Sequence, residues 1–115
     1  MENVILKKTI EFSLEIIKYV ELLEAKRKYV IANQLMKSGT SIGANVHEAQ
    51  NAESKADFTH KFKIAAKEVD ETKYWLVLCK NSNSYPDCGQ LEQPLYEIEK
   101  IITKIIATSK AVKVG

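Results

Sequence analysis

The sequence predicts an all-α protein, an up-down-up-down antiparallel four-helix bundle. Apolar residues recur at alternating spacings of four and three in four successive segments, which is the heptad period of helices packed at shallow crossing angles. The connections between these segments are short, so neighbouring helices run antiparallel. Only two prolines and four glycines interrupt the 115 residues, which leaves room for long helices. We expect one domain over residues 1–115, with helices at roughly 3–24, 28–50, 55–80 and 88–108.

Three of the four expected helices show one regular apolar stripe each. The stripes are Ile5, Thr9, Phe12, Ile16, Tyr19 and Leu23 in the first helix, Phe58, Phe62, Ala65, Val69, Thr72, Leu76 and Cys79 in the third, and Leu91, Leu95, Ile98, Ile102 and Ile105 in the fourth. A stripe of this period keeps one side of a helix against its partners. We therefore predict that these residues form the core.

The second expected helix has a looser stripe that is rich in small residues. The stripe consists of Ile31, Leu35, Gly39, Ile42, Val46 and Ala49, and Gly43 and Ala44 lie within it. A glycine costs a helix about 1 kcal/mol relative to alanine. Two glycines therefore indicate either that another backbone approaches closely or that the helix breaks at Gly39.

Polar segments join the four helices. Residues 24–28 form a charged turn, and Ser54-x-x-Asp57 is typical of a capping box at the start of the third helix. Residues 81–86 form the longest loop, and Asp87 is expected to cap the fourth helix with Gln90 three residues later. The tail from Ala107 onward is expected to fray.

The first helix carries more apolar surface than a monomer needs. A second stripe lies beside its core stripe, and an amphipathic helix of a monomer requires only one. Trp75 lies off the main stripe of the third helix, and tryptophan is enriched at interfaces. We predict a homo-oligomer whose interface contains Leu6, Ile10, Leu14, Ile17 and Trp75. The alternative is a wide core stripe with scattered surface apolar residues, and with Trp75 packed at the rim of its own bundle.

Bulk charge does not indicate a nucleic-acid partner, because 17 basic and 15 acidic residues leave a net charge of only +2. Local clusters do occur at Lys26-Arg27-Lys28 and at Lys63 and Lys67, one turn apart. A solvated helix surface is the alternative explanation. In an oligomer, symmetry repeats each cluster, so that several weak phosphate contacts act on one polyanion. These five residues are our candidates for phosphate neutralisation.

Little in the sequence suggests catalysis or a cofactor. A di-metal bundle needs two Glu-x-x-His pairs and two further glutamates, but Asp57-x-x-His60 is the only carboxylate-x-x-His pair. Cys79 and Cys88 form no C-x-x-C motif, and the sequence shows no His or Lys placed so as to lower the pKa of either thiol. No signal peptide or membrane-spanning stretch is recognisable. We expect a cytoplasmic protein that is not an enzyme and binds no metal or cofactor.

Residues 41–49 read Ser-Ile-Gly-Ala-Asn-Val-His-Glu-Ala. They are followed by Asp57-Phe58, by Ile64-Ala65-Ala66-Lys67-Glu68 and by Glu71-Thr72-Lys73-Tyr74-Trp75-Leu76. This order resembles the bacterial four-helix-bundle family labelled 23S rRNA-intervening sequence protein, over nearly the whole chain. The resemblance implies an up-down bundle that assembles as a homopentamer. The sequence is also similar to the accessory protein of diversity-generating retroelements. This similarity implies RNA or an RNA-bound protein as a partner. Neither resemblance implies any catalytic residues.

The polar residues in the matching segments have a structural interpretation as well. We predict that Ser41, Asn45, Glu48, Glu68 and Glu71 form an interhelical network with Lys67 that fixes the register of the second and third helices. Taken together, the sequence favours a non-enzymatic homo-oligomeric bundle that associates with RNA through phosphate contacts. The alternative is a protein–protein scaffold with no direct contact to nucleic acid.

Overall fold

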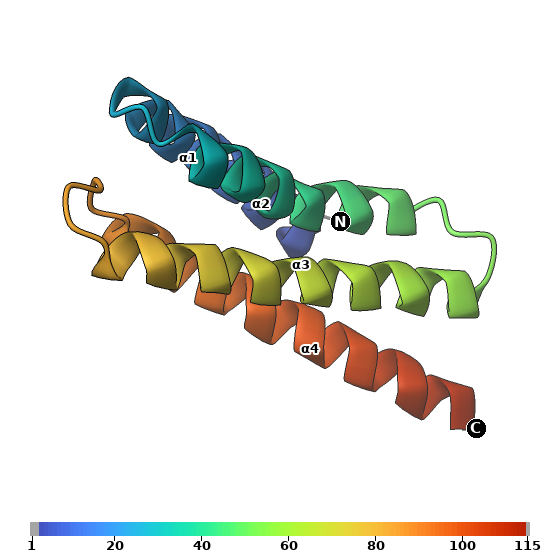
Figure 1. The fold of residues 1–115 in the computed structure, drawn as a ribbon. Helices are drawn as coiled ribbons and strands as arrows, with labels where there is room; N and C mark the ends of the chain where they lie inside the picture. Colours follow the sequence, from blue (N-terminus) through green and yellow to red (C-terminus); the bar gives the residue numbers. More distant parts are fainter. Residues whose placement is uncertain (1–2, 115) are drawn as a thin grey trace.

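The structure, a computed structural model, describes the backbone of residues 3–114 and the side chains of residues 3–109. Helix α1 runs over Val4–Ala25, α2 over Tyr29–Ala49, α3 over Lys55–Asn81 and α4 over Glu92–Val114, and a short 3-10 helix, η1, spans Gly89–Leu91. Each of α1 and α3 packs against both α2 and α4, and successive helices run in opposite directions (Figure 1). The predicted all-α, up-down antiparallel bundle is confirmed.

The heptad stripes of the sequence form the core. All six stripe residues of α1 are buried, as are six of the seven in α3, and Tyr19, Phe12 and Phe62 are the largest side chains in the interior. Phe58 and Ile105, at the outer ends of the stripes of α3 and α4, are only partly buried. The stripes therefore form the core along most of the length of the bundle, and at one end their residues become partly exposed.

Helix α2 continues through Gly39, so of the two sequence interpretations the close approach is the correct one. A Cβ atom at Gly39 would lie 2.8 Å from Cγ1 of Ile16, and one at Gly43 would lie 3.1 Å from Cβ of Thr9. Both distances are shorter than ordinary van der Waals contacts. The two glycines thus let α1 lie directly on the backbone of α2.

The ends of the helices follow the predicted caps in part. Ser54 Oγ accepts a hydrogen bond from the backbone N–H of Asp57 at 3.0 Å, as a capping box requires, but the Asp57 carboxylate accepts from Glu53 rather than from Ser54. Asp87 accepts from the backbone N–H of Gly89 at 3.1 Å and so stabilises the turn before η1. Helix α4 therefore begins at Glu92, four residues later than predicted, and it continues to Val114 instead of ending near residue 108.

Helices α3 and α4 project beyond α1 and α2 at one end. Asn3 at the start of α1 donates to Gln50 at the end of α2, and the Glu48–Lys61 ion pair leaves residues 55–60 of α3 beyond α2. The Lys8–Glu97 ion pair sets α1 and α4 antiparallel, which leaves α4 beyond about residue 101 without α1 beside it. Figure 1 shows the N-terminus well short of the outer ends of α3 and α4. We call residues 55–60 and 101–114 the two-helix end.

Candidate functional site

The basic turn Lys26-Arg27-Lys28 lies at the opposite end of the bundle from the two-helix end. Arg27 adopts a left-handed backbone conformation with φ of 62°, and the backbone N–H of Lys28 donates to the carbonyl of Leu23, so the chain reverses tightly after α1. Lys26 and Arg27 are exposed. The Lys28 ammonium lies 5.0 Å from the centre of the Tyr85 ring, a cation–π contact that ties the turn to the loop before η1.

Lys63 and Lys67 lie on the exposed side of α3, away from the basic turn. Neither ammonium pairs with a carboxylate among the side chains that the structure describes. Lys80, near the turn, is 13 residues further along α3 than Lys67, which corresponds to about 20 Å of helix. A single chain therefore presents the five candidate phosphate contacts as two separate groups, not as one patch.

The second apolar stripe of α1 forms part of a face that it shares with α2. Lys8 reaches α4 and Thr9 meets Gly43 of α2, so Ile10, the next residue around the helix, points away from α4 along the outer side of α2. Ile10 and Leu14 are 47% and 54% exposed, and Leu6 and Ile17 are partly buried. These four predicted interface residues lie together on one side of α1.

Helix α2 adds a second row to this face that the sequence reasoning missed. The row repeats at spacings of four and three and consists of Tyr29, Asn33, Met36, Thr40, Gly43 and His47. Tyr29 and Met36 are exposed, and none of the six carries a formal charge when His47 is neutral. The signal was present in the sequence as a second heptad register without charged residues, but the looser core stripe of α2 obscured it. We call the side chains of both rows the α1–α2 face.

Trp75 is not part of the α1–α2 face. It lies on α3 three residues after Thr72, whose hydroxyl donates to Ser38 of α2, so Trp75 is beside the α2–α3 seam. Its indole N–H donates to the Glu71 carboxylate at 3.1 Å, and its ring packs partly against the core and edge-on to Tyr74. Of the five predicted interface residues, the structure brings four together and separates Trp75 from them.

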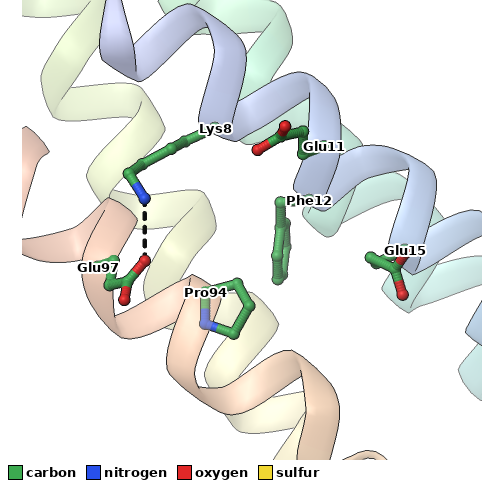
Figure 2. A pocket seen from close by; sticks show the side chains of 6 residues that line it. All are labelled: Lys8, Glu11, Phe12, Glu15, Pro94 and Glu97. Carbon is green, nitrogen blue, oxygen red and sulfur yellow. Dashed lines mark hydrogen bonds and ion pairs between the residues drawn. The ribbon is translucent and has the colours of Figure 1, made fainter.

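A hollow of about 430 Å³ opens between α1 and α4 (Figure 2). Phe12 and Pro94 face each other across it, and Lys8 extends from α1 to bind Glu97 of α4 at 2.9 Å. This hydrogen bond is the main reason that the pKa of the Glu97 carboxyl lies below its ordinary value. Glu11 and Glu15 complete the rim. The acidic rim disfavours phosphate here and directs any polyanion to other surfaces.

Residues 1–106 match the profile of a protein family described as 23S rRNA-intervening sequence protein. The chain belongs to this family. A solved structure with the same fold is that of a protein of unknown function from the S23 ribosomal protein family of Bacteroides thetaiotaomicron VPI-5482. It is 40% identical, covers 89% of this chain and 97% of its own, and has a TM-score of 0.82. No curated protein matches.

The polar residues of the family segments lie along the α2–α3 seam. Ser41 and Asn45 donate to backbone carbonyls one turn earlier in α2, those of Lys37 and Ser41. Among the predicted network residues in the described part of the chain, only Glu48 bonds to another helix, through Lys61 at 2.9 Å. Lys67 is exposed and outside this set. The buried polar bridge between the helices is instead Thr72 Oγ1 to Ser38 Oγ, at 3.0 Å.

Glu68 and Glu71 are one turn apart on this seam. Burial, and secondarily the neighbouring Glu71 carboxylate, raise the pKa of Glu68 above its ordinary value, and Lys37 of α2 partly opposes them. The partly buried Glu68 and the exposed Glu71 and Lys37 therefore form a polar strip beside Trp75. The strip is a surface feature of the seam rather than the closed interhelical network that the sequence suggested.

The two cysteines of this family member are buried thiols. Burial is the largest cause that raises the pKa of both Cys79 and Cys88, so neither is a reactive thiolate at neutral pH. Within the described residues, no three His, Cys, Asp or Glu side chains are grouped so as to hold a metal ion. No helix in the same part of the chain has the length and apolar character needed to cross a membrane.

Proposed function

We propose that this protein is a non-enzymatic, cytoplasmic homo-oligomer, a pentamer, that binds RNA through phosphate contacts. The observation that carries the proposal is the α1–α2 face, because Ile10 and Leu14 are about half exposed there and the rows of α1 and α2 that form it consist of residues without formal charge. Apolar surface of this kind on a bundle marks association. A closed ring would repeat every surface feature of the protomer.

Repetition of the basic groups around the proposed oligomer would strengthen their binding to RNA. A protomer presents two small basic groups, Lys26-Arg27-Lys28 and Lys63 with Lys67, and each group alone would bind a phosphate backbone weakly. Five copies around a ring would present them at regular intervals to one RNA chain, which raises the effective concentration of each later contact. The description of the family as a 23S rRNA-intervening sequence protein supports RNA as the polyanion.

Fluorescence anisotropy with a labelled structured RNA, measured over a series of salt concentrations, tests this proposal. We expect the logarithm of the affinity to fall linearly with the logarithm of the salt concentration, with a slope of roughly −0.9 per phosphate contact on duplex regions. The double variant Lys63→Glu, Lys67→Glu should bind more weakly with a shallower slope. The charge-matched control Lys18→Glu, Lys80→Glu should bind like the wild type.

The second candidate is a protein–protein scaffold, and the same exposed apolar side chains of the α1–α2 face favour it. One titration separates the two functions. RNA binding that is absent even at low salt, from a protein whose oligomeric mass is intact, would reject the RNA proposal in favour of the scaffold. Equal weakening by the control pair would show that only the total charge matters and would remove Lys63 and Lys67 from the site.

A further inference from the structure

The two-helix end carries a net positive charge. Its segments, residues 55–60 and 101–114, contain four lysines and one aspartate, a formal charge of +3, whereas the whole chain carries +2. The remainder of the protein is therefore net acidic. No aspartate or glutamate follows Glu99 in the sequence, and Lys63 and Lys100 border the same end. The near-neutral total thus conceals a separation of charge along the bundle.

An apolar hollow lies between the two helices at this end. Phe58, Ile101 and Ile105 line it, all partly buried, and Lys104, Thr108 and Ser109 form its edge around about 690 Å³ of space open to solvent. A smaller adjoining hollow is bounded by Lys55. Along the rest of the bundle α1 and α2 cover this side of α3 and α4, but both stop short of the two-helix end. The hollow is therefore the place that a further helix would fill.

The shape of the hollow and the charge around it indicate which class of partner would bind there. A second copy of the two-helix end would bring +3 against +3, which disfavours self-association there. A membrane surface would require protruding apolar side chains, but Phe58, Ile101 and Ile105 line a concave surface. Phosphate contacts of an RNA would satisfy Lys55 and Lys104 and leave the apolar floor uncovered. An amphipathic helix with a carboxylate-rich side would cover the apolar floor and place its carboxylates beside the lysines of the rim.

We propose that the two-helix end docks an acidic amphipathic helix of a partner protein. The apolar side of that helix packs on Phe58, Ile101 and Ile105, and its carboxylates face Lys55 and Lys104. Docking restores a layer of helix over α3 and α4 where α1 and α2 are missing. The site is separate from the residues assigned to phosphate binding in the proposed function, so either proposal can fail without the other.

A synthetic helical peptide tests the proposal on the full-length protein. The probe has leucines at positions i, i+4, i+7 and i+11 and glutamates on the opposite side, and its control has the same composition in scrambled order. Because Cys79 and Cys88 are buried, an environment-sensitive thiol dye can be placed selectively at Ser109→Cys, with Gln34→Cys as the control site on α2. We expect a saturable fluorescence change at position 109 with the ordered peptide only.

Charge variants test whether the lysines of the rim contribute to binding of the peptide. In the dye-labelled protein, Lys55→Glu with Lys104→Glu should raise the Kd of the peptide roughly tenfold or more, because two charge contacts are lost. The matched control Lys18→Glu with Lys80→Glu should change the Kd less than about twofold. All four of these lysines are exposed, so the bundle should fold normally, which circular dichroism verifies.

Three results would overturn the inference. The first is a dye response that is absent, or equal for the ordered and scrambled peptides. The second is an equal loss of affinity in the rim variant and the control variant. The third is a response at position 109 to a single-stranded RNA but not to the acidic peptide, which would assign the two-helix end to nucleic acid.

Discussion

At the scale of single residues, a buried polar group closes the end of the bundle near the basic turn. The Tyr19 hydroxyl donates to the carbonyl of Pro86 at 2.7 Å, and the Cys88 thiol contacts the carbonyl of Leu76 at 3.6 Å. Tyr19, Cys79 and Cys88 are all nearly inaccessible to solvent. The loop before η1 is thus fixed to α1 and α3 by groups that must stay protonated to remain buried.

These groups predict a loss of stability at alkaline pH. Burial raises the pKa of Cys79 and Cys88 above 9.0 and that of Tyr19 well above 10.0 in the folded protein. Above pH 9 the unfolded chain therefore releases protons that the folded chain retains, and the free energy of unfolding falls as pH rises. Urea unfolding between pH 7 and 11 measures this.

The variant Cys79→Ala, Cys88→Ala serves as the control for the alkaline effect. It lowers stability at every pH by creating small cavities, but its loss between pH 8 and 10 should be smaller than that of the wild type. Parallel pH profiles for the two proteins would show that other groups cause the alkaline loss.

At the scale of helices, α1 approaches the backbone of α2 closely at Gly39 and Gly43. Gly39, Gly43 and Ser38 are small residues at the points where α2 meets its neighbours, and Ile16 fills the space above Gly39. The sequence showed small residues here but left two explanations open. Helix α2 is continuous because burial against Ile16 and Thr9 outweighs the low helix propensity of glycine.

Gly39→Ala should therefore destabilise the protein, although alanine is the better helix former. A Cβ 2.8 Å from the fully buried Ile16 forces a displacement that costs about 1–3 kcal/mol, against about 1 kcal/mol gained in helix propensity. We expect a net loss of roughly 1 kcal/mol in chemical unfolding. Ile16→Val, which removes the Cδ1 contact at 2.9 Å, should cost less in the Gly39→Ala background than in the wild type. An increase in stability for Gly39→Ala would contradict the close approach.

At the scale of the whole molecule, the sides of the bundle differ in character. The side between α1 and α4 is acidic at its rim, the α2–α3 seam is polar, and the α1–α2 face is uncharged and carries exposed apolar side chains. A protomer with one uncharged side is suited to association through that side. The two-helix end lies along the axis of the bundle, apart from these lateral surfaces.

A charge placed on the α1–α2 face should dissociate the proposed oligomer. Leu14→Lys and Leu22→Lys make a matched pair on the same helix, since Leu14 is 54% and Leu22 50% exposed. Leu22 lies away from the row of Leu6, Ile10, Leu14 and Ile17. We expect native mass spectrometry to show a smaller species for Leu14→Lys only, with circular dichroism unchanged. Equal behaviour of the two variants would place the interface elsewhere.

The sequence by itself determined the fold, the core and three of the four helix starts. Heptad periodicity is a local property. Four short-linked segments with a 3.5-residue repeat bury their apolar stripes by packing against one another as an antiparallel bundle. The start of α4 was missed because Asp87 caps a turn and η1 intervenes. The grouping of four apolar residues on the outer side of α1 was likewise visible in the sequence, since it lies on one helix.

Only the tertiary structure decided how residues from different helices meet. It separated Lys26-Arg27-Lys28 from Lys63 and Lys67, placed Trp75 on another seam, and replaced the expected polar network by the Ser38–Thr72 bridge. It also revealed the two-helix end. The register and the relative lengths of packed helices depend on which side chains interdigitate across the core, and the periodicity of a single helix contains no information about that choice.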